Sequence, residues 1–195
     1  EGSDTVVFAG NKGDFTFEVA ADGTLTVTDL NTMTALGVDT ITGVETLSFD
    51  DGDLTVTTAE DGYVTLTGTD ADDDVTVVGA TAVTLQGRAG HDDIVAGSGD
   101  DSIYGGDGFD EIIAGSGDDA VDGGMGDDTI TGGMGDDTIE GGYGQDTVIF
   151  DGVQDDFTFA VASDGTLTVT DTTSALGTDV ISGVETLRFN DGDLT

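Results

Sequence analysis

Apolar and polar residues alternate in short bursts along much of the chain, which is the pattern of β-strands with one buried face. Residues 15–19 (FTFEV) and 24–28 (TLTVT) alternate on either side of an Asp-Gly pair, as the two strands of a hairpin do. Residues 157–170 repeat this arrangement. No segment keeps the 3.6-residue period of a helix, because Gly, Thr and Asp interrupt every candidate. The pattern therefore predicts an all-β fold.

A nine-residue repeat occupies the middle of the chain. Residues 87–149 divide into seven consecutive units, each with Gly at its fourth place, Asp at its sixth and Ile or Val at its eighth. This G-G-x-G-x-D-x-U-x pattern is typical of a calcium-binding parallel β-helix. Residues 68–76 (GTDADDDVT) form a degenerate earlier unit, and residues 77–86 keep the apolar alternation but lack the acidic loop.

A second, longer repeat surrounds the nonapeptides. Residues 4–29 recur at 146–171, an offset of 142, and residues 35–55 recur at 175–195, an offset of 140. Asp4 aligns with the aspartate of the seventh nonapeptide, so the chain opens inside a unit of this kind. We therefore expect a piece of a longer tandem array with neighbouring copies of the same unit, although a two-copy duplication predicts the same pattern.

Charge changes the interpretation of these repeats. The chain carries 42 acidic and 3 basic residues, a formal charge of −39, and has no Cys. Such acidity argues against binding to nucleic acid or an anionic membrane, and no apolar run approaches the ~18 residues of a membrane span. Without Cys there are no disulfides and no thiolate metal sites. The charge is most simply offset by cations that the sequence does not encode.

Stacked nonapeptides place their aspartates in two ladders. Two units make one coil, so each unit stacks on the unit 18 residues later, with strands about 4.8 Å apart. The ladders are Asp92, Asp110, Asp128 and Asp146, and Asp101, Asp119 and Asp137. Carboxylates about 5 Å apart repel by roughly 1 kcal/mol even in water, and a divalent cation between them reverses this. Oxygen ligands without thiol or imidazole favour Ca²⁺, which tolerates irregular coordination better than Mg²⁺.

These nonapeptides resemble the repeats-in-toxin (RTX), or hemolysin-type, calcium-binding repeats of exported bacterial proteins. The resemblance is strong over 87–149 and weaker over 68–86. It implies a right-handed parallel β-roll in which each calcium ion lies between loops one coil apart. The ion would be held by both aspartates, by carbonyls from places two and four of one loop, and by carbonyls from places one and three of the next. Besides the seven aspartates, the metal residues implied are Gly90, Gly97, Gly99, Gly106, Gly108, Gly115, Gly117, Gly124, Gly126, Gly133 and Gly135.

This scheme implies five calcium sites, each formed by consecutive aspartates of one ladder. Arg88 stands where place two of the first unit usually has Gly, which leaves the first site open. A sixth site would pair Asp137 with Asp155, although the counterpart of Asp155 in the first copy of the long repeat is Gly13.

The repeats and the resemblance together predict four regions. Residues 1–55 are a β-rich flank with the end of a preceding roll and hairpins, and residues 56–86 are a strand-rich lead-in with degenerate repeats. Residues 87–149 are the calcium-binding β-roll, and residues 150–195 are a second copy of the flank. We expect the flanks to be antiparallel strands that cap the roll, since open coil ends expose sheet edges.

The function expected is that of a structural repeat unit of a large secreted or cell-surface bacterial protein, of the adhesin or surface-layer type, that folds on binding extracellular calcium. Export by type I secretion is implied by the RTX resemblance alone. The alternative is a non-catalytic accessory module of an exported enzyme or toxin. We expect no enzyme activity, because no catalytic constellation is visible. A binder of sugar or ice is a third hypothesis, which the mixed residues at the outward places seven and nine disfavour.

Overall fold

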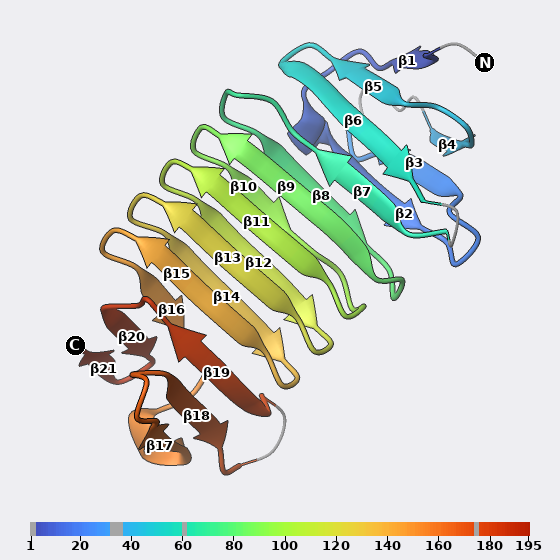
Figure 1. The fold of residues 1–195 in the computed structure, drawn as a ribbon. Coiled ribbons are helices and arrows are strands. Elements are labelled where there is room, and N and C mark those ends of the chain that lie inside the picture. The colour runs from blue at the N-terminus through green and yellow to red at the C-terminus, as the bar shows by residue number, and fades with distance from the viewer. Residues whose placement is uncertain (1–2, 32–36, 60–61, 174–175) are drawn as a thin grey trace.

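The computed structural model describes residues 3–31, 37–59, 62–173 and 176–195. These residues form two β-sheets that face each other along a flattened solenoid, with the N-terminus at one end and the C-terminus at the other (Figure 1). Two short 3-10 helices, η1 (Lys12–Asp14) and η2 (Gln154–Asp156), are the helical elements of the described chain. Within the described residues, no helix combines the length and the apolar character needed to cross a membrane. The predicted all-β fold is confirmed.

The first sheet has 11 strands in the spatial order β1 (Thr5–Val7), β5 (Thr46–Phe49), β6 (Gly52–Thr58), β7 (Val64–Thr67), β9 (Val83–Ala89), β11 (Ser102–Asp107), β13 (Ala120–Met125), β15 (Thr138–Tyr143), β19 (Thr178–Ser182), β18 (Leu167–Asp171) and β17 (Phe157–Val161). The second has 10 strands in the order β21 (Gly192–Leu194), β20 (Thr186–Phe189), β16 (Thr147–Ile149), β14 (Thr129–Met134), β12 (Glu111–Ser116), β10 (Asp93–Val95), β8 (Asp74–Val78), β2 (Phe15–Val19), β3 (Leu25–Asp29) and β4 (Val38–Ile41).

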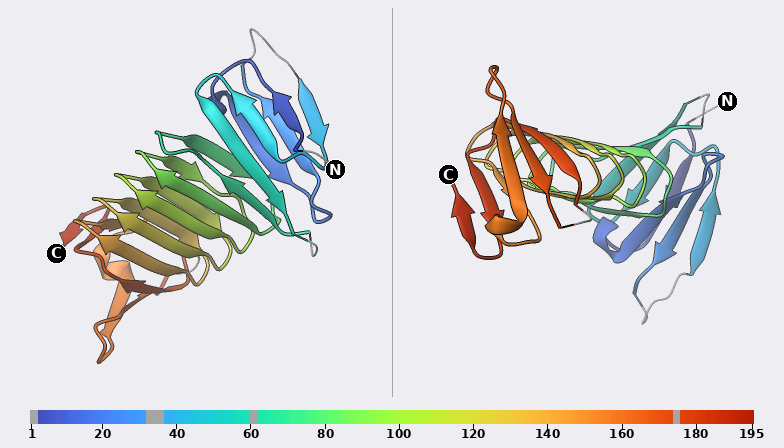
Figure 2. Two further views of the ribbon diagram at one scale, coloured as in Figure 1. Left: turned by 45° about the horizontal axis from the view of Figure 1, so that its top comes forward. Right: turned by 90° about the horizontal axis from the view of Figure 1, so that it is seen from below.

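Successive nonapeptides alternate between the two sheets, as the 18-residue coil requires. Ile103 of β11 pairs with Val121 of β13, and Ile112 of β12 pairs with Ile130 of β14, all in parallel strands. Figure 2 shows the outcome as a stack of flattened coils with similar outlines. The predicted parallel β-roll with two nonapeptides per coil is therefore confirmed.

The core of the roll is a row of aliphatic side chains from place eight of each unit. These side chains, from Ile94 to Val148, are between 0 and 4% exposed. Burying each one contributes roughly 1.5–3 kcal/mol. Since the aspartate at place six stands two residues before each aliphatic residue, the packing of the core also fixes where the carboxylates lie.

The flanks continue the two sheets of the roll. In the first flank, β2 pairs in parallel with β8, and β7 pairs in parallel with β9. In the second flank, β19 pairs in parallel with β15, and β20 pairs in parallel with β16. Antiparallel pairing adds β3 and β4 to β2, and β17 and β18 to β19, whereas β1 pairs with β5 in parallel. The expected antiparallel flanks thus lie at both ends of the roll, within the same two sheets.

Each flank has its own aromatic cluster. Phe8, Phe15 and Phe49 pack with ring centroids 5.3 Å apart in the first flank, and three phenylalanines of the second flank repeat the cluster at 5.1–5.4 Å. The two copies of the long repeat therefore fold alike, which permits position-by-position comparison of their surroundings.

Candidate metal centre

The loops between strands depend on glycine at places two and four. Gly124 and Gly126 have φ of 107° and 136°, in the left-handed region where L side chains are strained. A Cβ on either would also overlap the carbonyl oxygen of the equivalent glycine one coil earlier, Gly106 or Gly108. The glycines therefore let neighbouring loops approach closely, with their carbonyls facing the next loop.

Arg88 keeps the same loop geometry without glycine. Its φ of 92° makes it the one non-glycine residue with positive φ in the described part of the chain. Its carbonyl oxygen lies against Gly106, as the carbonyl of Gly97 lies against Gly115. Its exposed side chain pairs with Asp70 at 3.0 Å. The departure at place two thus keeps the backbone carbonyl in the position that glycine gives it in the other units.

The structure places all seven predicted aspartates in the two ladders. Each Oδ1 accepts a hydrogen bond from a backbone N–H one coil earlier, which for Asp101 is that of Val83, at 2.9 Å. Between ladder aspartates, Asp92 donates to Asp110 at 2.9 Å, and Asp101 to Asp119 at 2.7 Å. The remaining pairs, at 2.9 Å, are Asp110 with Asp128, Asp119 with Asp137, and Asp128 with Asp146. The seven side chains are between 0 and 2% exposed. One carboxylate oxygen of each aspartate is therefore used in a hydrogen bond that joins two neighbouring coils.

The second oxygen of each aspartate has no partner. Oδ2 is buried and makes no hydrogen bond in Asp92, Asp101, Asp110, Asp119, Asp128, Asp137 and Asp146. A buried carboxylate without a partner costs several kcal/mol, so an orphaned acceptor of this kind normally marks a ligand or ion. Seven such atoms at equivalent positions indicate one type of site used repeatedly.

Burial also disfavours the charged form of these side chains. Desolvation, with a smaller contribution from neighbouring carboxylates, raises the pKa of Asp92, Asp101, Asp128 and Asp137 to about 6. Desolvation likewise raises the pKa of Asp110, Asp119 and Asp146. These shifts apply without a metal ion, and a divalent cation would oppose them by stabilising the carboxylate.

Backbone carbonyls supply further oxygens beside the orphaned ones. A Cβ on Gly87 or on Gly105 would overlap both Oδ2 of the aspartate in its own unit and a carbonyl oxygen from the next coil. In the described part of the chain, no three Asp, Glu or His side chains lie close enough together to hold a metal alone. Two aspartates with surrounding carbonyls form an all-oxygen donor set, which fits Ca²⁺.

The structure extends the first ladder to Asp73. The Asp73 N–H donates to Asp92 Oδ1 at 2.8 Å, and Asp73 itself is 3% exposed. Its carboxylate pairs with the Nζ of Lys12 at 2.9 Å, and Lys12 is 0% exposed. The same Nζ lies 3.4 Å from Asp51 Oδ1 and donates to the Asp51 carbonyl at 3.1 Å. At this end of the ladder an ammonium group pairs with Oδ1, the oxygen that accepts a backbone N–H in the seven other aspartates, and Asp73 Oδ2 accepts from the Thr69 N–H.

Asp73 could have been found from the sequence, because it holds place six of the degenerate unit 68–76. Nothing in the sequence indicated Lys12, which lies in the first flank.

At the other end, the predicted partner of Asp137 was wrong. Asp155 lies in η2, whereas the Asp137 N–H donates to Asp179 Oδ1 at 3.0 Å. Asp179 is 4% exposed, and desolvation raises its pKa to about 7. In the first ladder, Glu185 takes the corresponding position and accepts from the Asp146 N–H at 2.9 Å.

A sequence signal for Asp179 exists. Gly177, Asp179 and Ile181 have the spacing of places four, six and eight of a nonapeptide. The unit is separated from the others by the hairpin of the second flank, so a search for contiguous repeats passes over it.

A second row of side chains follows place five on the surface. The N–H of Asp118 donates to Asp100 Oδ1 at 3.0 Å, and that of Asp136 donates to Asp118 Oδ1 at 2.9 Å. His91 belongs to this row: its Nδ1 accepts from the Phe109 N–H at 2.9 Å, and the two rings stack 4.9 Å apart. These exposed side chains join neighbouring coils by hydrogen bonds. They do not pair with the buried Oδ2 atoms of the aspartates at place six.

Comparison with known protein families matches residues 67–103, 95–130 and 122–156 to the RTX calcium-binding nonapeptide repeat (4 copies). Comparison with curated proteins finds no significant match. The matched residues include the seven orphaned aspartates and the glycine loops that carry the carbonyls. Residues 67–156 therefore consist of repeats of the RTX calcium-binding family.

Proposed function

We propose that this chain is a structural unit of a large secreted or cell-surface bacterial protein, of the adhesin or surface-layer type, whose roll folds when it binds calcium. The observation that carries the proposal is the set of seven buried, unpaired Oδ2 atoms in coil-by-coil register. At neutral pH, an interior with this many unmatched acceptors is stable only when cations satisfy them.

The sites follow from the ladders. Consecutive aspartates define five positions: Asp92 with Asp110, Asp101 with Asp119, Asp110 with Asp128, Asp119 with Asp137, and Asp128 with Asp146. Asp137 and Asp179 define a sixth between the roll and the second flank. Carbonyls from the predicted glycines would complete each donor set. Calcium bound there would supply positive charge between carboxylates that otherwise repel.

The link to secretion is a matter of calcium concentration. Extracellular calcium modules work at dissociation constants of ~10⁻⁴–10⁻³ M, far above cytosolic calcium levels. A chain of net charge −39 repels itself when no cations are bound. The roll would therefore stay unfolded inside the cell and fold after export, and binding free energy would become folding free energy.

A calcium titration followed by circular dichroism and calorimetry tests the proposal. We expect β-structure of the roll to be lost in excess chelator and regained with calcium, with about five or six ions bound per chain. Magnesium at equal concentration is the control and should restore much less, because it dehydrates reluctantly and prefers strict octahedra. An unchanged spectrum in chelator together with no calcium uptake would contradict the proposal.

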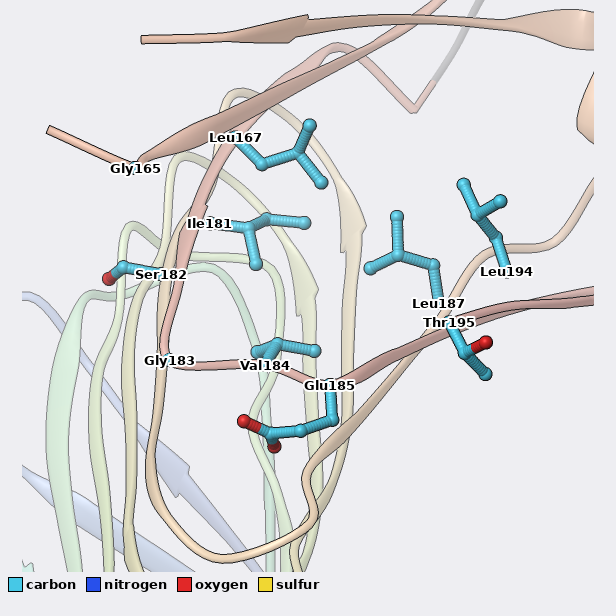
Figure 3. A pocket seen from close by; sticks show the side chains of 10 residues that line it. All are labelled: Gly165, Leu167, Ile181, Ser182, Gly183, Val184, Glu185, Leu187, Leu194 and Thr195. Atoms are coloured by element: carbon cyan, nitrogen blue, oxygen red, sulfur yellow. The ribbon is translucent and has the colours of Figure 1, made fainter. Parts of the chain in front are cut away.

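A surface pocket in the second flank gives no support for an enzymatic role. It has a volume of about 230 Å³ and lies in the second flank, lined mainly by apolar side chains such as Leu167, Ile181 and Leu187 (Figure 3). Glu185 is the one ionisable side chain in its lining, and this carboxylate already accepts from the Asp146 N–H. We therefore infer a non-catalytic role for the chain.

A further inference from the structure

The two flanks have the same fold but different neighbours. In the second copy of the long repeat, β19 pairs with β15 of the roll, and β16 pairs with β14. Their counterparts in the first flank, β4 and β1, are the outermost strands of their sheets. β4 pairs with β3 and β1 with β5, both within the flank. The N-terminal end of the molecule therefore presents two open strand edges, one on each sheet (Figure 1).

The open edge of β4 carries the residues that dock β19 on the roll. Asp39 and Ile41 are the counterparts of Asp179 and Ile181. In the second flank, Ile181 pairs with Ile139, and Asp179 Oδ1 accepts from the N–H of the preceding aspartate in the ladder. Asp179 is buried there, whereas Asp39 is exposed. Ile41 is already buried, at 8% exposed, so Asp39 is the docking residue that lacks a covering coil.

The β1 edge has the same hydrogen bond as its counterpart in the second copy of the long repeat. The Asp4 N–H donates to Glu45 Oε2 at 2.8 Å, matching the 2.9 Å bond from Asp146 to Glu185 in the second flank. Figure 3 shows that second-flank turn, with the Glu185 side chain directed toward the coils of the roll. Asp4 is exposed, whereas Asp146 is 0% exposed.

Apolar residues add to these open edges. Val7 of β1 is 76% exposed and Val38 of β4 is 64% exposed. A soluble protein usually covers or charges such an edge, because it is a template for pairing with another strand.

Building on the proposed function, we propose that the N-terminal end is a docking surface for the last coil of a neighbouring calcium-loaded roll of the same kind. The coil that covers the matching surface within this molecule, β14 with β15, identifies the occupant. Docking would set Asp39 against the place-six aspartate of the incoming coil, as Asp179 is set against Asp137. A calcium ion between them would offset two carboxylates that otherwise repel.

The test is a chain in which a copy of residues 56–145 directly precedes Asp4, so that the added roll meets the first flank as residue 145 meets Asp146. Asp39→Asn is made in the original and in the extended chain, with Asp179→Asn as the matched control. We expect Asp39→Asn to leave the calcium stoichiometry of the original chain unchanged and to remove one ion from the extended chain. Asp179→Asn should remove one ion from both.

Amide hydrogen exchange gives a second readout. Protection across β4 should rise about tenfold or more in the calcium-loaded extended chain relative to the original. Unchanged exchange in β4, a silent Asp39→Asn in the extended chain, or added coils that bind no calcium would each overturn the proposal. So would a calcium-dependent dimer of the original chain that Asp39→Asn dissociates, since the occupant would then be a second N-terminal end. Failure of the proposed function is distinct, because the unextended chain would then bind no calcium.

Discussion

A single atom, Oδ2 of the place-six aspartate, sets the behaviour of each repeat. In Asp119, as in the other six, Oδ1 is satisfied by a backbone N–H and Oδ2 is buried without a partner. Oδ1 of this side chain therefore has a structural role, and Oδ2 is free to bind a metal ion. An amide in its place keeps the structural half and removes the charged ligand.

Asp119→Asn tests this division. The substitution removes a charged ligand from two positions, those shared with Asp101 and with Asp137. We expect calcium affinity at these two positions to fall roughly tenfold or more, while the calcium-free variant is no less folded than the original chain because a buried charge is gone. Calorimetric titration and thermal melts with and without calcium measure both effects. Asp118→Asn is the control: Asp118 is the exposed neighbour, and its Oδ1 can remain an acceptor in the amide. Equal losses in the two variants would contradict the assignment.

Lys12 is the residue whose loss should matter with or without calcium. Lys12→Met leaves the buried Asp73 carboxylate without its charged partner, which costs about 3–5 kcal/mol. Chemical denaturation should show this loss in calcium, and also in chelator at about pH 4, where the calcium-free roll is expected to be most stable. Arg188→Met is the matched control, since Arg188 is half exposed and lies 3.4 Å from Asp193, a pair worth about 0–1 kcal/mol. A loss seen only in calcium would show that Lys12 acts through a metal site.

At the scale of elements, the loops between strands set the spacing of coils. Gly124 illustrates this, because it combines a positive φ with close approach to Gly106 O. The two effects can be separated, since Gly165 in the hairpin of the second flank has φ of 94° and open space where a Cβ would lie.

Gly124→Ala should therefore destabilise the calcium-loaded roll more than Gly165→Ala. The second substitution measures backbone strain alone, about 1–2 kcal/mol. The first adds a collision with the neighbouring coil and should also weaken calcium binding, because the loop carbonyls are displaced. Thermal melts and calcium titrations of both variants provide the comparison. Equal effects would mean that the coils can move apart without loss.

Prediction from sequence worked where the repeat is contiguous. The nine-residue period specified the strands, the coil of two units, the buried row at place eight and the aspartate ladders, because each depends on residues close in sequence. The partner of Asp137 was misplaced because strand pairing brings Asp179 to it across 42 residues. Lys12 was missed for the same reason, since it reaches Asp73 through the pairing of β2 with β8.

At the scale of the whole molecule, the ladders make stability depend on pH in opposite ways with and without calcium. Folding raises the pKa of four ladder aspartates from 3.8 to about 6. The calcium-free folded state thus binds more protons than the unfolded state between these values. The stability that these four aspartates contribute to the calcium-free fold is fully present below about pH 4 and is lost as the pH rises through about 6.

Chemical denaturation of calcium-free protein between about pH 4 and 8 tests whether its stability falls as the pH rises. We expect the calcium-free roll to be most stable at the acidic end, with a weaker dependence in Asp119→Asn. With calcium present the trend should reverse, because protons compete with the metal for the same oxygens. A calcium-free roll that gains stability as the pH rises would contradict the assignment of the buried carboxylates.

The register of 18 residues between paired strands also has a mechanical consequence. In the folded stack, one coil adds about 4.8 Å along the solenoid axis. The same 18 residues, pulled straight, span about 60 Å. Tension along the axis acts directly on the hydrogen bonds between coils and on the calcium ions proposed to lie between them. Each coil that opens under load would lengthen the molecule by more than ten times its folded height. Calcium concentration would then set the force at which the coils open and the molecule lengthens.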